Sequence, residues 1–326
     1  MKRWQEMSTV LEVKDVKLYY KTMIGVVKAV ENATFTLKEG ETIALIGESG
    51  CGKTTLARAI MRFLPRNVAE YNGSIKIEGV ETIALSDREF DEKIRWKKIS
   101  YVSQAAMNSL NPVIKVVDHL IEPLIIHFKT SKEEAVKRAA EILKKVGIVE
   151  EFLWRYPFEL SGGMKQRVVI AMSLITNPRI VILDEPTSAL DVMTQANILN
   201  MLKEIRNSMK ISYIFITHDI STSSELADKV AVMYAGQIVE LGPAEKVYVD
   251  PAHPYSQGLL GSVPRLRTER PVAFIPGTPP SLINPPKGCR FRPRCKHVMP
   301  ICEREPPVIE IGTDSYVRCW LYGGKA

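Results

Sequence analysis

The sequence has no long apolar run, and this absence limits the classes of protein that it can encode. No run approaches the roughly 18 apolar residues of a membrane-spanning helix. The first ten residues, MKRWQEMSTV, lack the apolar stretch of a signal peptide. We therefore expect a soluble, cytosolic chain. Repeats and low-complexity tracts are also absent, and a content of 45% hydrophobic and 25% charged residues excludes a disordered or collagen-like chain.

Proline, cysteine and net positive charge are low in the first three quarters of the chain and concentrated after them. Only 7 of the 20 prolines precede residue 251, and only one of the 5 cysteines precedes residue 289. Residues 261–326 carry six of the seven net positive charges, so the preceding part is nearly neutral. We predict a domain of residues 1–250 followed by a small, irregular, Pro-rich domain of residues 251–326. This distribution of charge does not indicate nucleic-acid binding.

Apolar strand patterns alternate with helical patterns along the first domain. Residues 41–47, 179–184 and 212–217 are rich in Ile, Val and Leu with little polar alternation, which is typical of parallel strands covered on both faces. The helical patterns are Thr55 to Leu64, Ser131 to Val146 and Gly163 to Thr176. Together they predict a doubly wound α/β domain. The first 40 residues favour antiparallel strands, and a helical subdomain is expected at about 105–165.

A glycine-rich segment indicates a phosphate-binding loop. Residues 47–54, GESGCGKT, match G-x-x-x-x-G-K-[ST] between a predicted strand and a predicted helix. The glycines allow backbone N–H groups to surround phosphates, and the helix adds its positive N-terminus. Lys53 would place its charge near the β and γ phosphates, and Thr54 can bind magnesium. The motif therefore predicts binding of a nucleoside triphosphate with Mg²⁺.

A second motif supplies carboxylates. The strand pattern RIVILDEP ends in Asp184 and Glu185, about 130 residues after the phosphate loop. A carboxylate at a strand end can hold magnesium, and one beside it can accept a proton from an attacking water. The two motifs together predict phosphoryl transfer to water.

Further segments resemble the ATPases of ABC transporters. Residues 160–167, LSGGMKQR, resemble the signature motif of that family. Gln104 in SYVSQ resembles the Q-loop, SALD ending at Asp191 the D-loop, and His218 in ITHD the switch histidine. The resemblance covers about residues 10–245. It implies a P-loop NTPase fold of the ABC ATPase type, with an antiparallel β subdomain and a helical insert.

The resemblance also implies roles for individual residues. In this family two subunits sandwich two ATP molecules head to tail, so Ser161 and Gly163 would donate to the γ phosphate held by the other subunit's Lys53. Glu185 would be the general base and His218 the γ-phosphate sensor. Magnesium would contact Thr54, Gln104 and Asp184. The residues expected at ATP are Tyr20, Gly47, Ser49, Gly50, Cys51, Gly52, Lys53, Thr54, Thr55, Gln104, Ser161, Gly162, Gly163, Gln166, Asp184 and Asp191.

Two of these residues have competing interpretations. Tyr20 resembles the aromatic residue that stacks on adenine, but Tyr19 could serve instead, and either could be an ordinary strand tyrosine. Cys51 is interpreted as a small residue tolerated in the phosphate loop. Its thiol is expected to make the ATPase sensitive to alkylation.

Four cysteines near the end of the chain predict a metal site. Their spacing is C-x5-C-x6-C-x16-C, and a reducing compartment favours metal over disulfides. The spacing lacks the short C-x2-4-C pairs of zinc sites and differs from common ferredoxin patterns, so it leaves the metal open. The segment resembles the C-terminal extension of oligopeptide and dipeptide importer ATPases, which implies a 4Fe-4S cluster, with Zn²⁺ as the alternative. A structural staple is favoured over a redox sensor. The four residues are Cys289, Cys295, Cys302 and Cys319.

The resemblance implies the ATP-hydrolysing subunit of an importer for dipeptides or oligopeptides, peripheral on the cytoplasmic face of the cell membrane. Expected partners are two transmembrane permease subunits docked on the helical insert, a second ATPase subunit that is the same chain or a paralogue, and an extracytoplasmic peptide-binding protein. Nucleic acid is not expected. The alternative is a soluble ABC ATPase of cluster assembly or of nucleic-acid or ribosome function. Nickel complexes and oligosaccharides also stay open as transported substrates.

Overall fold

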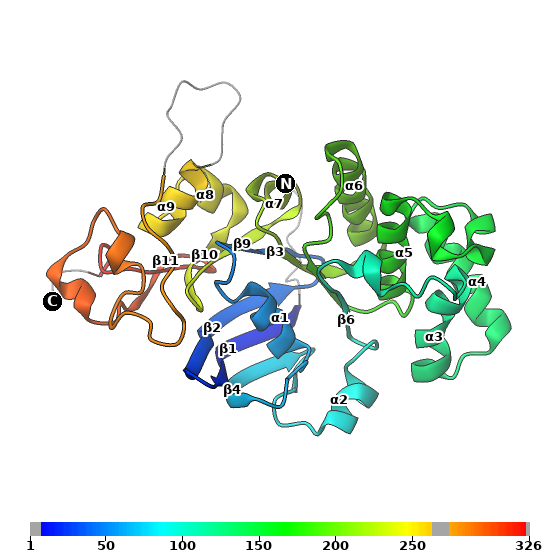
Figure 1. Cartoon of the computed structure of the whole chain (residues 1–326), viewed down its shortest axis with the longest axis horizontal. Helices are drawn as coiled ribbons and strands as arrows, with labels where there is room; N and C mark the ends of the chain where they lie inside the picture. Colours follow the sequence, from blue (N-terminus) through cyan, green and yellow to red (C-terminus); the bar gives the residue numbers. More distant parts are fainter. Residues whose placement is uncertain (1–7, 263–273, 324–326) are drawn as a thin grey trace. The chain divides into compact units, whose positions relative to one another are not determined.

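The computed structural model describes residues 8–262 and 274–323 (Figure 1). Its internal contacts divide the chain into two units, which are considered separately. The first unit comprises Met1–Leu11, Leu37–Glu41 and Lys76–Ile216; the second comprises Glu12–Thr36, Thr42–Ile75 and Thr217–Ala326. The compositional boundary near residue 250 falls inside the second unit. The division into residues 1–250 and 251–326 stays a prediction.

A parallel sheet forms the centre of the first unit. Strand β7 (Ile180–Asp184) pairs in parallel with β6 (Ile99–Val102) on one side and with β8 (Ser212–Ile216) on the other. Every residue of β7 and β8 is buried. Continuous apolar sequence suits strands that are covered on both faces, and this is why the pattern predicted both strands to within a residue or two.

The regular elements between β6 and β7 are all helices or helical turns. The capping residue Ser131 begins α4, because its hydroxyl accepts from the backbone N–H of Glu134 at 3.3 Å. The helices α3, α4 and α5 pack against one another (Figure 1). The elements of the interval are η1 (Ala106–Ser109), α3 (Val116–Phe128), α4 (Lys132–Lys145), η2 (Glu150–Trp154), η3 (Pro157–Glu159) and α5 (Gly162–Leu174). The unit also contains β5 (Val80–Glu81), α2 (Asp87–Lys93) and α6 (Val192–Met209).

A small sheet made mostly of the first strands belongs to the second unit. Strand β1 (Thr9–Thr22) lies between β2 (Gly25–Lys38) and β4 (Val68–Ile77). Only Met23 and Ile24 separate β1 from β2, and so short a connection can join only antiparallel strands. Buried and half-buried residues alternate along the C-terminal half of β2, which matches the alternation in its sequence.

The larger sheet of this unit carries the phosphate loop. Its order is β11 (Val308–Gly312), β12 (Ser315–Arg318), β10 (Gln237–Pro243), β9 (Lys229–Tyr234) and β3 (Thr42–Ile46). Strands β3 and β9 are parallel, whereas the pairs β9–β10, β10–β12 and β11–β12 are antiparallel. The helices are α1 (Lys53–Ile60), α7 (Ile220–Leu226), α8 (Ala244–Val249), α9 (Pro254–Gly261), η4 (Arg292–Arg294) and η5 (Pro300–Glu303).

The description of the C-terminal segment as wholly irregular is wrong. The β11–β12 hairpin extends the sheet, with Glu240 opposite Val317 and Leu241 opposite Tyr316. The ring of Phe291 packs edge-on against Tyr234 of β9, with ring centroids 5.2 Å apart. Two short strands partnered with a distant one give little local signal in a Pro-rich stretch, so composition concealed them. The segment therefore shares the core of the second unit.

Candidate functional site

The loop between β3 and α1 has a backbone that only glycine can adopt. Gly47, Gly50 and Gly52 have φ angles of 149°, 77° and 109°. A Cβ atom on Gly47 would lie 2.2 Å from the carbonyl oxygen of Met233, and one on Gly52 would lie 2.4 Å from that of Ala29. Gly50 faces open space, with no atom within 4 Å of its Cβ position. The loop is therefore closely backed by main chain and open around Gly50, as a phosphate cradle requires.

The Lys53 side chain folds back across this loop. Its Nζ donates to the carbonyl oxygens of Gly47 at 2.7 Å and Glu48 at 3.0 Å, and the side chain is buried. Among the described residues no carboxylate pairs with this ammonium. A buried cation with only neutral partners favours an anionic ligand. These residues fit the binding of ATP phosphates.

The thiol of Cys51 is less available than expected. Cys51 is 5% exposed, and its burial raises the pKa of the thiol, an effect only partly offset by Lys53. A protonated, buried thiol reacts slowly with alkylating reagents, since the thiolate is the nucleophile. We therefore no longer expect marked alkylation sensitivity.

In the first unit the two acidic residues at the end of β7 have different surroundings. Asp184 is fully buried and accepts a hydrogen bond from the Tyr101 hydroxyl at 2.8 Å. Glu185 has a φ of 51°, and its carboxylate accepts from the Gln104 amide at 3.0 Å. A non-glycine residue in the left-handed region is strained, and such strain gathers at functional positions. The structure thus brings the Q-loop glutamine to the predicted general base.

Tyr101 is a site residue that sequence reasoning missed. It lies on β6, opposite Ile182 of β7, and therefore reaches the end of the neighbouring strand. No local signal marks it, because its partner Asp184 lies 83 residues further along the chain. The hydroxyl orients the Asp184 carboxylate.

The variant Tyr101→Phe removes this hydrogen bond and should raise the Mg²⁺ concentration needed for half-maximal ATPase by about tenfold, since a bond to a charged group contributes about 1.5–3 kcal/mol. Steady-state ATPase at varied Mg²⁺ measures the effect. The matched control is Tyr322→Phe, which removes a 3.0 Å hydrogen bond to the carbonyl of Ala252. Equal magnesium dependence in both variants would show that Tyr101 does not orient Asp184.

The signature segment begins helix α5 with an open N-terminus. The Ser161 hydroxyl accepts from the Met164 backbone at 3.3 Å, and Ser161 and Gly162 are exposed. The first turn carries no acidic residue, so its N–H groups and the helix dipole favour an anion there. A Cβ on Gly163 would lie 2.8 Å from the Thr194 methyl carbon. Gln166 is buried and does not share the exposed end of the helix.

Asp191 has a local structural role. It caps α6 by accepting from the Thr194 backbone at 3.0 Å and from the Thr194 hydroxyl at 2.6 Å. These hydrogen bonds, from the side chain first and then the backbone, lower the pKa of the carboxyl. The carboxylate is exposed as well as capping, so it is also available to a second molecule.

Three further predicted residues lie in the second unit. Tyr19 is buried, and its hydroxyl donates to Glu31 at 2.7 Å, whereas Tyr20 keeps a partly exposed ring. The geometry favours Tyr20 over Tyr19 for adenine stacking. His218 lies two residues after the end of β8 and is exposed. Thr55 lies in the first turn of α1.

The four C-terminal cysteines line one pocket in the second unit. Cys289, Cys295, Cys302 and Cys319 surround it together with Phe291 and other residues, and all four are free thiols. Burial raises the pKa of Cys289 to about 11, and repulsion by the other three thiols adds to the effect. In the described parts of the chain, no three His, Cys, Asp or Glu side chains are close enough to share a metal ion. The prediction of a C-terminal metal-binding domain is therefore not supported by the described residues, although its four cysteines line one pocket.

His253 also lines this pocket, but its side chain caps helix α9. Its Nδ1 accepts from the Tyr255 backbone at 3.0 Å, and its burial lowers the pKa of the imidazole to about 3. The ring is therefore neutral and serves as the cap of α9.

None of the helices in residues 8–262 and 274–323 is both long enough and apolar enough to cross a membrane.

Comparison with known families finds "ABC transporter" over residues 30–188 and "Oligopeptide/dipeptide transporter, C-terminal region" over residues 239–302. Among solved structures, the ATP-binding cassette MJ0796 in its dimeric state with ADP and Pi is 31% identical with a TM-score of 0.64. The match covers 72% of this chain and 98% of that chain.

Relatives match nearly the whole chain. The oligopeptide transport ATP-binding protein OppD of Bacillus subtilis is 47% identical over 95% of this chain and 88% of its own length. The dipeptide transport ATP-binding protein DppD of Caldanaerobacter subterraneus is 43% identical over 97% of this chain and 98% of its own length. OppD of Escherichia coli is 43% identical over 94% and 91%. These relatives favour transport over the soluble ABC alternative. The chain belongs to the ATP-binding proteins of oligopeptide and dipeptide ABC transporters, and it is an ATPase that powers peptide import.

Proposed function

We propose that the phosphate loop of the second unit binds the ATP phosphates, and that Asp184 and Glu185 of the first unit serve magnesium binding and water activation. The observation that carries this proposal is the buried Lys53 ammonium. Its only partners are neutral, and it lies in a loop whose glycines cannot be replaced without a clash or a strained backbone. Thr54 and Gln104 complete the magnesium contacts, and His218 senses the γ phosphate. Bound magnesium supplies charge neutralisation on the phosphates.

We infer that each ATP is completed by a second ATPase subunit. The exposed N-terminus of α5 at Ser161 and Gly162 offers N–H donors that are free to meet a neighbouring molecule. The dimeric structure of the related cassette MJ0796 supports the pairing. Head-to-tail pairing would place one subunit's Ser161 and Asp191 at the ATP of the other. The second subunit is the same chain or a paralogue.

Two transmembrane permease subunits are proposed to dock on the helical interval. This interval exposes several large apolar side chains, which are unusual on a surface without a partner. The most exposed are Val113 at 76%, Phe158 at 66%, Val149 at 60% and Trp154 at 55%. Docking would hold the chain at the cytoplasmic face of the membrane. An extracytoplasmic binding protein would deliver the peptide, and the permeases would select dipeptides or longer peptides.

The four cysteines are proposed to hold a 4Fe-4S cluster as a structural staple. Their convergence on one pocket supports a shared ligand. Four thiols could ligate either a 4Fe-4S cluster or a Zn²⁺ ion, and only the resemblance to importer ATPases favours the cluster. Bound iron supplies the positive charge that keeps the four sulfurs deprotonated.

The test of the ATP site pairs Lys53→Ala with Lys132→Ala, an exposed lysine at the start of α4. Lys53→Ala should weaken MgATP binding by about tenfold or more, since it removes a buried charge–phosphate contact. Lys132→Ala should bind as the wild type does. A fluorescent ATP analogue reports both dissociation constants. Unchanged affinity in Lys53→Ala would refute the assignment of the loop.

Mixing Lys53→Ala with Ser161→Ala extends the test to the paired site. In a mixed dimer, one site receives an intact Lys53 from one chain and an intact Ser161 from the other. ATPase in the mixture should therefore exceed that of either variant alone, if the chain pairs with itself. If activity returns only when a variant of this chain is mixed with the complementary variant of a paralogue, the paralogue is the second ATPase subunit. Activity that stays at the mean of the two variants in every combination would contradict completion in trans.

A further inference from the structure

An arginine of the C-terminal segment reaches the phosphate loop. We propose that Arg294 is a positioning residue for nucleotide binding: it holds and neutralises Glu48, the second residue of the loop. The inference rests on the proposed function, because it assumes that this loop binds ATP. Arg294 follows 246 residues after Glu48 and directly precedes Cys295, one of the four pocket cysteines.

The contact between the two side chains is bidentate. Arg294 Nη1 donates to Glu48 Oε2 at 2.7 Å, and Nη2 donates to Oε1 at 2.9 Å. The arginine side chain is 5% exposed and that of the glutamate 26%. A guanidinium that meets a carboxylate through two parallel hydrogen bonds fixes both its position and its orientation. The pair is thus a defined structural link and not an exposed surface ion pair.

Other groups hold the guanidinium in place. Its Nε donates to the Pro276 carbonyl at 2.8 Å, and its plane lies over the Tyr234 ring, 5.8 Å from the centroid. The helical turn η4 carries Arg294 and is closed by a hydrogen bond from the Arg294 N–H to the Phe291 carbonyl at 2.9 Å. Arg294 therefore reaches Glu48 from a fixed base.

The main chain of Glu48 is tied to the same region. Its N–H donates to the Tyr255 hydroxyl at 2.9 Å, and its carbonyl accepts from Lys53 Nζ at 3.0 Å. Tyr255 lies on α9 and is fully buried. One residue of the phosphate loop is thus held at its backbone N–H by α9 and at its side chain by Arg294. The loop receives its shape in part from residues beyond 250.

The charge of Glu48 gives the pair a second role. The carboxylate belongs to a loop whose ligand is a polyanion, so an unpaired Glu48 would repel the phosphates. Arg294 cancels that charge. Loss of Arg294 should therefore harm nucleotide binding more than loss of Glu48, because only the former leaves an uncompensated negative charge in the loop.

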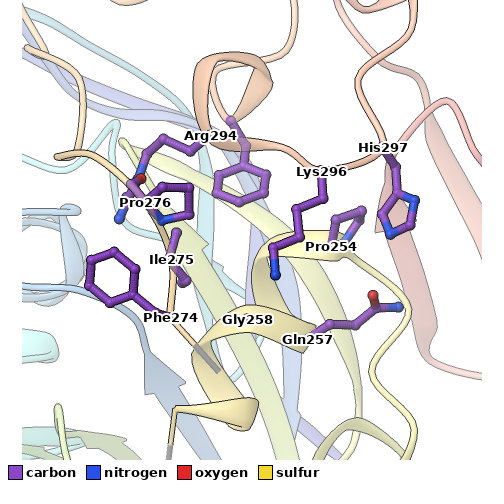
Figure 2. A pocket seen from close by; sticks show the side chains of 10 residues that line it. Pro254, Gln257, Gly258, Phe274, Ile275, Pro276, Arg294, Lys296 and His297 are labelled. Carbon is purple, nitrogen blue, oxygen red and sulfur yellow. The ribbon is translucent and has the colours of Figure 1, made fainter. Parts of the chain in front are cut away.

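A pocket beside Arg294 makes the test practicable. Arg294 lines a cavity of about 210 Å³ together with Phe274, Lys296 and His297, and Figure 2 shows Arg294 near Pro276 and His297 on the opposite side. Shortening Arg294 would enlarge an existing pocket and not leave a sealed void. Lys296 lines the same pocket, and no described residue forms an ion pair with it. Lys296→Gln is therefore the matched control for removing a positive charge here.

The experiment compares ATP titrations of the full chain for Arg294→Gln, Glu48→Gln, the double variant and Lys296→Gln. Arg294→Gln should raise the KM for ATP by about tenfold with kcat within about twofold. Glu48→Gln should raise it by no more than about threefold, and the double variant should return to the value of Glu48→Gln. Lys296→Gln should match the wild type. Iron content and melting temperature are measured for every variant.

The outcomes separate the possible roles. An unchanged KM in Arg294→Gln overturns the proposal, and so does a double variant as impaired as Arg294→Gln, which would indicate a purely structural role. If Arg294→Gln alone does not fold, the double variant Arg294→Gln/Glu48→Gln tests the charge: KM within about threefold of the wild type supports the proposal, and a tenfold rise in a folded protein overturns it. Failure of the underlying site is distinct, since it appears as unchanged ATP affinity in Lys53→Ala.

Discussion

Glu185→Gln should lower the rate of ATP hydrolysis by about 100-fold or more while MgATP affinity stays within about twofold, since general-base catalysis contributes about 10²–10⁴-fold. The amide has the shape of the carboxylate and can still accept the hydrogen bond that Gln104 donates at 3.0 Å in the wild type. It cannot accept the proton of the attacking water. The change therefore removes one chemical function and keeps the local geometry.

Single-turnover and steady-state ATPase assays measure this effect, with Glu204→Gln as the matched control. Glu204 is an exposed residue of α6, so its neutralisation should leave turnover within about twofold. If ATP is sandwiched between two subunits, blocked hydrolysis should also preserve the MgATP-bound dimer on size exclusion. Retention of more than about a tenth of wild-type turnover would remove Glu185 from the general-base role.

If the four cysteines hold the proposed cluster, Cys302→Ser should release its iron and lower the free energy of unfolding by more than about 2 kcal/mol, because loss of a structural metal is among the most destabilising single changes. Cys302 is buried in η5, and its carbonyl accepts from the Cys289 N–H at 3.0 Å. The surrounding segment consists mainly of short helical turns, which supply little core of their own.

Metal analysis, visible absorption and thermal melting measure this outcome. Cys51→Ser is the matched control, because Cys51 is also buried but lies in the phosphate loop. It should retain full iron and the broad absorption near about 400 nm expected of a thiolate-bound cluster. Zinc without iron in the wild-type protein would replace the cluster by the zinc alternative. A metal-free wild type with unchanged stability in Cys302→Ser would exclude both.

Local motifs predicted the parts of the site that depend on neighbouring residues. The phosphate loop was predictable because its chemistry requires glycines and a lysine at fixed spacing, and the structure gives Gly47 and Gly52 the φ angles that this spacing implies. The buried strands β7 and β8 were predictable because burial on both faces requires uninterrupted apolar residues. The start of α4 was predictable from Ser131, because a capping side chain bonds to the backbone of the first turn of its own helix.

Contacts between distant residues could not be predicted in this way. The Tyr101 hydroxyl meets Asp184 across 83 residues, and Arg294 meets Glu48 across 246. No local sequence pattern identifies such a partner, because the two side chains come together only when the tertiary structure forms. The β11–β12 hairpin was hidden for the same reason, since its pairing partner β10 lies far back in the chain.

The pairing of β12 with β10 also has a consequence during synthesis on the ribosome. Tyr316 is made 75 residues after its partner Leu241. At about 5–20 residues per second, this delay is roughly 4–15 seconds. Throughout that time one edge of β10 offers unpaired N–H and C=O groups, which is the kind of surface through which nascent chains associate. Strand β12 therefore covers this edge of β10 only late in translation. Until then the edge is available for pairing with another nascent chain.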